Sequence, residues 1–279
     1  MEWWIWPILL FAVSFFIGIV AVLSGVGGGV LFVPLVSGFF PFHLDFVRCA
    51  GLLVALSVSL AAGPELLKKG MADLRLAIPA GLIASTTSVI GALIGLSLPA
   101  HILQIALGVA ILCIVVVMTG AKKSEYPDVR EPDALCCALK IGCVYHEPTE
   151  KRDVNWQIHR TPLGFFMFIF IGLLAGMFGL GAGWANVPVL NLIMGAPLKV
   201  SVATSVFLLS ITDSSAAWIY INKGALFPMV VIPSVIGVML GSHIGAKLLC
   251  NTRPKAVKLM VLGLLVLAGL RSITKGFGY

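Results

Sequence analysis

Two glycine clusters carry the most informative chemistry in the chain: SGVGGG at residues 24–29 and FGLGAG at residues 178–183. Each lies inside a long apolar stretch, where glycine-rich backbone is tolerated in a membrane only if it is buried in protein or lines a cavity. A helix that restarts after such a break points unpaired N–H groups and a positive dipole end at whatever lies beyond, which suits a small anion. Close packing of small residues between helices would produce the same clusters without a ligand. Pro34 and Pro188, each five residues after the last glycine, favour real helix breaks.

Polar side chains near the clusters could complete an anion site. Ser24, Trp184, Asn186 and Asn191 offer hydroxyl, indole N–H or amide donors to an oxyanion. Asn186 is the strongest candidate because a lone amide in lipid needs a partner, although an interhelical hydrogen bond would also satisfy it. A hydroxyl-rich segment follows at Thr204, Ser205, Ser210, Thr212, Ser214 and Ser215. Hydroxyls in a membrane helix more often bond to their own backbone than to a ligand.

Asp213 and His243 are the ionisable residues inside the apolar stretches. Such groups are costly at membrane depth and suggest a site, a proton relay or a buried pair. Asp213 would repel an anionic substrate unless it were protonated, so proton coupling is a hypothesis for both residues. A structural hydrogen bond for Asp213 and packing near the membrane interface for His243 are the alternatives. Arg48 and Lys199, at the starts of equivalent helices, could attract anions, but we favour a role in anchoring helix ends.

No metal, cofactor or enzymatic chemistry is expected. Cys136, Cys137, Cys143 and His146 share one loop, but adjacent cysteines followed by C-x₂-H do not reproduce a regular zinc spacing. The sequence has no G-x₄-G-K-[ST] loop, so ATP does not drive the protein directly. A His/Glu metal cluster or a nucleophile–base pair does not stand out either.

The elements that must position these residues are membrane helices. Of the 279 residues, 59% are hydrophobic and 11% are charged, with a mean hydropathy of +1.05. Soluble proteins have about 45–50% apolar and about 25% charged residues, so this chain lacks the charge to cover a water-soluble surface. The composition excludes a soluble enzyme. It also makes the net charge of +7 a mark of cytoplasmic loops rather than of a nucleic-acid-binding face.

The two glycine clusters belong to an internal repeat. A shift of 154 positions lays residues 18–34 over residues 172–188 with seven of 17 positions identical, and the same shift later pairs Gly70 with Gly224 and Gly91 with Gly245. Such duplication is typical of secondary transporters. We predict an all-α polytopic membrane protein with a first transmembrane repeat at 1–120, a polar connector at 121–161 and a second repeat at 162–279. The connector has the pattern of a small β-hairpin around EPTEKRD.

The basic residues favour an inverted arrangement of the repeats. If each half crosses the membrane four times, the 19 Lys and Arg residues divide 13 to 6 between the two sides; if each glycine-broken run is a hairpin, each half crosses five times and they divide 15 to 4. The positive-inside rule therefore favours ten passes and places the connector in the cytoplasm. Eight passes remain the alternative.

The paired motifs GVGGGVLFVPL and GLGAGWANVPVL resemble those of the sulfite exporter TauE/SafE family, also described as the 4-toluene sulfonate uptake permease family. The resemblance extends to VATSVFLL and to the YHEPTE-type connector, and it covers nearly the whole chain. It implies a secondary carrier of small sulfur-containing anions in a prokaryotic inner membrane, and it carries Thr204 and Ser205 into the site. The expected substrate-binding set is then Ser24, Gly25, Gly27, Gly28, Gly29, Gly179, Gly181, Gly183, Trp184, Asn186, Thr204 and Ser205.

The predicted function is transport of an organosulfonate such as sulfoacetate, or of sulfite or thiosulfate, by alternating access and in the export direction. An anion channel and a proton-coupled carrier of another small organic anion are the alternatives. The expected partners are the anion, the lipid bilayer and a second copy in a homodimer. The two halves also differ, because Ala50, Gly51 and Leu52 lie near where the second half has Ala203, Thr204 and Ser205. An asymmetric site with more polar contacts from the second half would fit a substrate with two different ends.

Overall fold

The computed structural model describes residues 4–24, 27–68, 72–120, 133–139, 141, 144–147, 152–248 and 254–277. These residues are mostly helical, and seven of the described helices are long and apolar enough to cross a membrane. The prediction of an all-α polytopic membrane protein is confirmed. In chain order the elements are α1 (Ile5–Ser24), α2 (Gly28–Phe39), α3 (Leu44–Lys68), α4 (Leu74–Ser97), α5 (Ala100–Gly120), α6 (Ala134–Leu139), β1 (Val144–Glu147), β2 (Arg152–Asn155), α7 (Thr161–Phe178), α8 (Gly183–Pro188), the π-helix η1 (Val189–Ile193), α9 (Leu198–Asn222), α10 (Pro228–Leu248) and α11 (Pro254–Gly276).

Both glycine clusters interrupt a helix. In the first half α1 ends at Ser24 and α2 begins at Gly28, with Gly27 at a φ of 92° before it. In the second half Gly179 ends α7 at a φ of 68°, and Gly181 has a φ of 71° before α8 begins. Side chains rarely adopt these left-handed conformations, so glycine is the residue that allows the chain to turn here. The broken helices expected from the sequence are therefore present.

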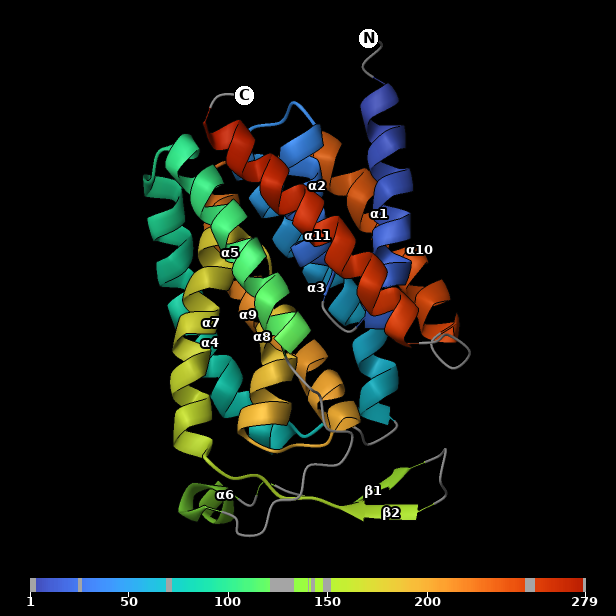
Figure 1. Ribbon diagram of the computed structural model, residues 1–279, viewed down its shortest axis with the longest axis vertical. Helices are drawn as coiled ribbons and strands as arrows, with labels where there is room; N and C mark the ends of the chain where they lie inside the picture. The colour runs from blue at the N-terminus through green and yellow to red at the C-terminus, as the bar shows by residue number, and fades with distance from the viewer. Residues whose placement is uncertain are drawn as a thin grey trace.

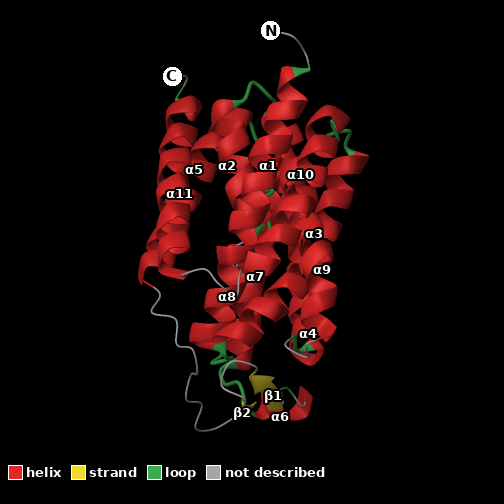
Figure 2. Ribbon diagram, turned by 90° about the vertical axis from the view of Figure 1, so that its right-hand side faces the viewer, coloured by secondary structure: helices red, strands yellow, loops and turns green. Residues whose placement is uncertain are grey.

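The helices of the two halves begin at opposite ends of the molecule. Figures 1 and 2 show both termini at one end and the connector, with α6 and the β1–β2 hairpin, at the other. Accordingly α1 starts from the end that holds the termini, whereas α7 starts from the connector end (Figure 1). In the hairpin, β1 and β2 pair antiparallel with Val144 opposite Asn155.

Helix starts recur along the chain at the offset found in the sequence. The first residues of α3, α4 and α5 are Leu44, Leu74 and Ala100, and 154 positions later α9, α10 and α11 begin. Packing between the halves is also reciprocal, because α1 packs on α10 and α7 packs on α4. Each half thus contributes its first helix to the other half.

Glycines allow these helix pairs to approach closely. A Cβ atom on Gly18 of α1 would overlap Val238 of α10, and one on Gly176 of α7 would overlap the backbone of Ser88 on α4. Lipid chains are as apolar as leucine, so helix association in a membrane depends on close contact of this kind rather than on the hydrophobic effect. The scaffold around the breaks is therefore held by backbone-to-backbone packing.

We expect Gly176→Ala to lower the melting temperature of the purified protein. The new methyl group would meet the Ser88 carbonyl, and overpacking of this kind costs about 1–3 kcal/mol of the free energy of unfolding. Tryptophan fluorescence during heating in detergent would measure the change. Gly263→Ala on α11 is the matched control, since nothing lies within 4 Å of its added Cβ. Equal melting temperatures for the two variants would contradict the packing argument.

Candidate functional site

The two helix breaks meet at one place in the interior. A Cβ atom on Gly27 would lie 3.9 Å from the Cα of Gly183 and 3.5 Å from Cδ1 of Leu209 on α9. From the second break, a Cβ on Gly181 would lie 3.5 Å from Cδ2 of Leu209 and 3.1 Å from Oδ2 of Asp213. Breaks that are far apart in the sequence therefore face the same stretch of α9.

One face of α9 presents polar groups toward the breaks. Ser205, Leu209 and Asp213 are spaced four residues apart, so they share a helix face, and Leu209 touches both breaks. Asp213 is fully buried, and Ser205 is 1% exposed. Among the residues that the structure describes, neither the Ser205 hydroxyl nor the two carboxyl oxygens of Asp213 has a hydrogen-bond partner. The Asp213 carboxyl group therefore lies at the meeting point without a hydrogen-bond partner among the described residues, and Ser205 lies on the same face of α9.

The short helix α8 adds two more polar side chains. Asn186 is 1% exposed, and neither its amide nitrogen nor its amide oxygen has a partner in the described part of the chain. The indole Nε1 of Trp184 is also buried and has no hydrogen-bond partner among the described residues. Its ring packs against two hydrophobic clusters of the core. Because α8 packs on α9, these groups lie on the element next to Ser205 and Asp213. Buried polar groups in proteins are nearly always hydrogen-bonded, so such a set indicates a site for a polar ligand.

The first half has no unpartnered polar side chain at the equivalent described positions. The positions 154 residues earlier are Val30, Phe32, Gly51 and Ser59. Val30 and Phe32 are fully buried in the hydrophobic core, and the Ser59 hydroxyl donates to the Ala55 carbonyl at 3.1 Å. Among the described residues, the polar side chains at the meeting point therefore come from the second half, while Gly27 of the first half approaches it with its backbone.

Several glycines of the expected binding set make close packing contacts with other segments. A Cβ on Gly28 would meet Val58 of α3 at 3.0 Å, and one on Gly29 would meet the Leu180 carbonyl oxygen at 2.5 Å. At Gly179 the added atom would lie 2.6 Å from the Arg48 carbonyl oxygen. Gly27, Gly181 and Gly183 are the cluster glycines at the meeting point itself. Close packing therefore accounts for Gly28, Gly29 and Gly179, and ligand binding by Gly27, Gly181 and Gly183 stays a prediction.

Other expected residues lie apart from the meeting point or outside the described part. The Thr204 hydroxyl accepts a hydrogen bond from the Asp73 backbone N–H at 3.2 Å, which ties α9 to the start of α4. The Asn191 amide donates to the Ala196 carbonyl at 2.8 Å. His243 is exposed on α10. Gly25 falls outside the described residues, and so does the side chain of Ser24.

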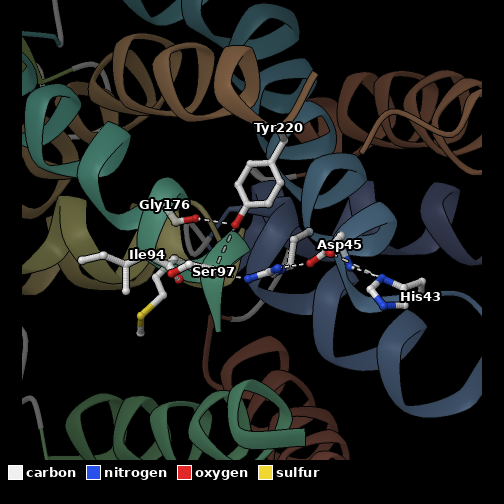
Figure 3. A network of polar contacts seen from close by, with 8 residues as sticks. His43, Asp45, Ile94, Ser97, Gly176 and Tyr220 are labelled. Carbon is white, nitrogen blue, oxygen red and sulfur yellow. Dashed lines mark hydrogen bonds and ion pairs between the residues drawn. The ribbon is translucent and has the colours of Figure 1, made fainter. Parts of the chain in front are cut away.

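A polar network fixes the end of α7 just before the second break. Arg48 is 1% exposed; it pairs with Asp45 and donates to the Met177 carbonyl at 2.9 Å. Tyr220 points toward Gly176 in Figure 3 and donates to that carbonyl at 2.9 Å. The guanidinium carbon of Arg48 lies 5.3 Å from the Tyr220 ring centroid. Arg48 therefore anchors a helix end, which is the role favoured from the sequence. The sequence did not predict a role for Tyr220, because its hydrogen-bond partners are distant in the sequence.

The cysteines of the connector differ in environment. Cys136 is 2% exposed and donates its thiol to the Ile141 carbonyl at 3.1 Å, whereas Cys137 is exposed. Burial raises the pKa of the Cys136 thiol above its usual value. Cys143 and the side chain of His146 lie outside the described residues. Within the part that is described, no group of three His, Cys, Asp or Glu residues could hold a metal ion.

We expect iodoacetamide to alkylate Cys137 several-fold faster than Cys136 at pH 8. The raised pKa leaves less of the Cys136 thiol as the reactive thiolate, and burial limits access to it. Tandem mass spectrometry of the peptide that contains both residues would measure the two rates. Raising the pH should increase the Cys136 rate, because more thiolate forms. Equal rates at the two positions would contradict this assignment.

Comparisons with known proteins agree on one family. A family model described as "Sulfite exporter TauE/SafE" matches residues 10–272. "Probable membrane transporter protein YunE" from Bacillus subtilis (strain 168) is 26% identical over 118 residues. That match covers 42% of this chain and 43% of the relative, so the chain spans less than half the length of this curated relative. No solved structure matches the chain significantly.

Proposed function

The chain belongs to the sulfite exporter TauE/SafE family, and on this premise we propose that it is a secondary transporter of a small sulfur-containing anion. The proposed substrate is an organosulfonate such as sulfoacetate, or sulfite or thiosulfate. The proposed direction is export across the cytoplasmic membrane by alternating access. The family is one of membrane transporters, which supports a transport function.

One observation carries the proposal: unpartnered polar groups gather where two helix breaks meet. Trp184, Asn186 and Ser205 offer an indole N–H, an amide and a hydroxyl in an otherwise apolar interior. A sulfonate or sulfite head has several oxygens that accept hydrogen bonds from donors of these kinds. Substrate sites in secondary transporters typically lie near the membrane midplane, between repeats and at interrupted helices. The cluster lies beside two interrupted helices, one from each half of the chain, which supports the proposal.

Alternating access is supported by the relation between the halves. We propose that they are inverted repeats, because their helix starts recur at an offset of 154 and their first helices enter from opposite ends (Figure 1). The reciprocal packing of α1 on α10 and of α7 on α4 fits the same symmetry. In this ten-pass arrangement 15 of the 19 basic residues lie on the side of the connector, which supports a cytoplasmic connector.

The first experiment is a thermal-shift panel on the purified protein with sulfite, thiosulfate, taurine, sulfoacetate, sulfate and acetate. A ligand that binds only the folded state stabilises it by about 2.7 kcal/mol at a concentration of 100 times its Kd. We expect selective stabilisation by one sulfur-containing anion. Stabilisation by a cation or a neutral metabolite alone would overturn the proposal. Saturable uptake with counter-transport in vesicles would then separate a carrier from a channel.

Asn186→Ala should weaken binding of the anion identified in this panel roughly tenfold or more. A hydrogen bond to a charged group contributes about 1.5–3 kcal/mol, and its loss is expected here because the amide has no other partner among the described residues. Isothermal titration calorimetry would give the two affinities. Val30→Ala, at the first-half position equivalent to Trp184, is the control, since it removes apolar packing and no donor. Equal losses in both variants would exclude an asymmetric site.

Asp213→Asn should remove a pH dependence of transport. A charged carboxylate at the meeting point would repel an anion, whereas a protonated carboxyl could donate a hydrogen bond to it. The wild-type uptake rate in proteoliposomes is therefore expected to fall as the pH rises, and the variant, which stays neutral, should give a flat profile. His243→Asn tests the other residue of the hypothesis; because His243 is exposed on α10, we expect this variant to keep the wild-type profile. The proton-coupling hypothesis fails if Asp213→Asn retains the wild-type profile.

A further inference from the structure

A second polar feature lies at the end of the molecule that holds both termini (Figure 1). There a cleft of about 570 Å³ opens between the start of α1 and the ends of α2 and α11. Its walls combine the aromatic rings of Trp6, Phe39 and Phe40 with the basic residues Arg271 and Lys275. The cleft shares no residue with the cluster around Asp213, so it is a different site from the proposed substrate site.

The two basic residues of the cleft make different contacts with the end of α2. Lys275 donates to the backbone carbonyls of Ser37 and Phe40 at 2.6 and 3.4 Å, at the end of α2. Arg271 extends across Gly38, where its Cγ would lie 3.2 Å from an added Cβ. In the part of the chain that the structure describes, no carboxylate forms an ion pair with either residue. Among the described residues, no carboxylate therefore neutralises the positive charge of the cleft.

The surroundings favour a lipid over a soluble anion. Phe39 is 60% exposed at the rim of the cleft, although an aromatic ring gains nothing from contact with a free phosphate in water. Leu267 lies one turn before Arg271 on the same face of α11 and is 63% exposed. A ligand bound at Arg271 would thus have an apolar track running from it along the outside of α11. A phosphate head with attached acyl chains matches both parts, because a guanidinium group hydrogen-bonds phosphate oxygens and the exposed apolar side chains can contact the acyl chains.

We propose that this cleft binds the headgroup of an anionic phospholipid, with Arg271 as the principal contact to its phosphate. Lys275 adds charge while it holds the end of α2 to α11. Tryptophan prefers the headgroup level of a bilayer, so Trp6 at the start of α1 fits this position. The bound lipid would bridge α11 and α2, and α2 is the helix that follows the first glycine break. Binding is therefore expected to stabilise the folded protein.

The experiment titrates the purified full-length protein in detergent with dihexanoyl phosphatidylglycerol and follows the melting temperature. Dihexanoyl phosphatidylcholine tests whether the negative charge matters, and glycerol 3-phosphate tests whether a soluble phosphate suffices. We expect phosphatidylglycerol alone to stabilise the wild type. Arg271→Gln should bind it about fivefold more weakly, the size expected for one basic residue near a lipid headgroup.

Two further variants control for general charge and for folding. Lys223→Gln removes an exposed basic residue outside the cleft and should bind phosphatidylglycerol like the wild type. Lys223 lies at the same end of the molecule, because the nearby Phe227 packs against Phe42, which follows α2. Arg271→Lys should recover most of the affinity that Arg271→Gln loses. The proposal is overturned if Arg271→Gln binds phosphatidylglycerol as tightly as the wild type, or if phosphatidylcholine stabilises equally. Equal stabilisation by glycerol 3-phosphate would instead identify a site for soluble anions.

Discussion

The fold depends on one constraint: backbone groups that lack helical hydrogen bonds must be shielded from lipid. Lipid offers no partners to the unpaired N–H and C=O groups at a helix break, so both breaks must be enclosed by protein. Enclosure is close here: Gly29 packs on the Leu180 carbonyl of the other break, and Gly51 of α3 packs on the Gly179 carbonyl. Each break therefore forms part of the wall around the other. The position of the candidate site follows from this constraint, because the two breaks can shield each other only where the halves meet.

The exchange of first helices between the halves provides the frame for this enclosure. Since α1 packs on α10 and α7 packs on α4, each broken helix is held by a long helix of the opposite half. The network of Arg48 and Tyr220 then fixes the carbonyl end of α7, where an uncompensated helix terminus would otherwise be buried. What remains at the centre is α8 with one face of α9. Four of the buried polar side chains that lack partners among the described residues belong to these two elements: Trp184, Asn186, Ser205 and Asp213.

Sequence reasoning predicted the parts of this arrangement that depend on local chemistry. Glycine clusters in apolar runs predicted the breaks, because few other residues fit a left-handed turn at membrane depth. It could not decide which way the polar residues face. The helices α9 and α10 are apolar on most sides, so their pattern does not distinguish buried Asp213 from exposed His243. Nor does any local signal reveal that Thr204 pairs with the Asp73 backbone or that Tyr220 reaches Gly176, since these partners come from other helices.

The difference between the halves has a physical consequence for how the site could work. Close backbone approach is required on both sides of the interface, so both clusters keep their glycines, whereas donors are needed only where a ligand's charge is held. Val30 and Phe32 occupy the first-half positions equivalent to Trp184 and Asn186, and they are buried in the hydrophobic core. A ligand at the meeting point would therefore contact donors on one side and apolar surface on the other. That division suits a molecule with an oxyanion head and a small carbon body better than a bare symmetric oxyanion, because a bare oxyanion would leave part of its charge facing hydrocarbon.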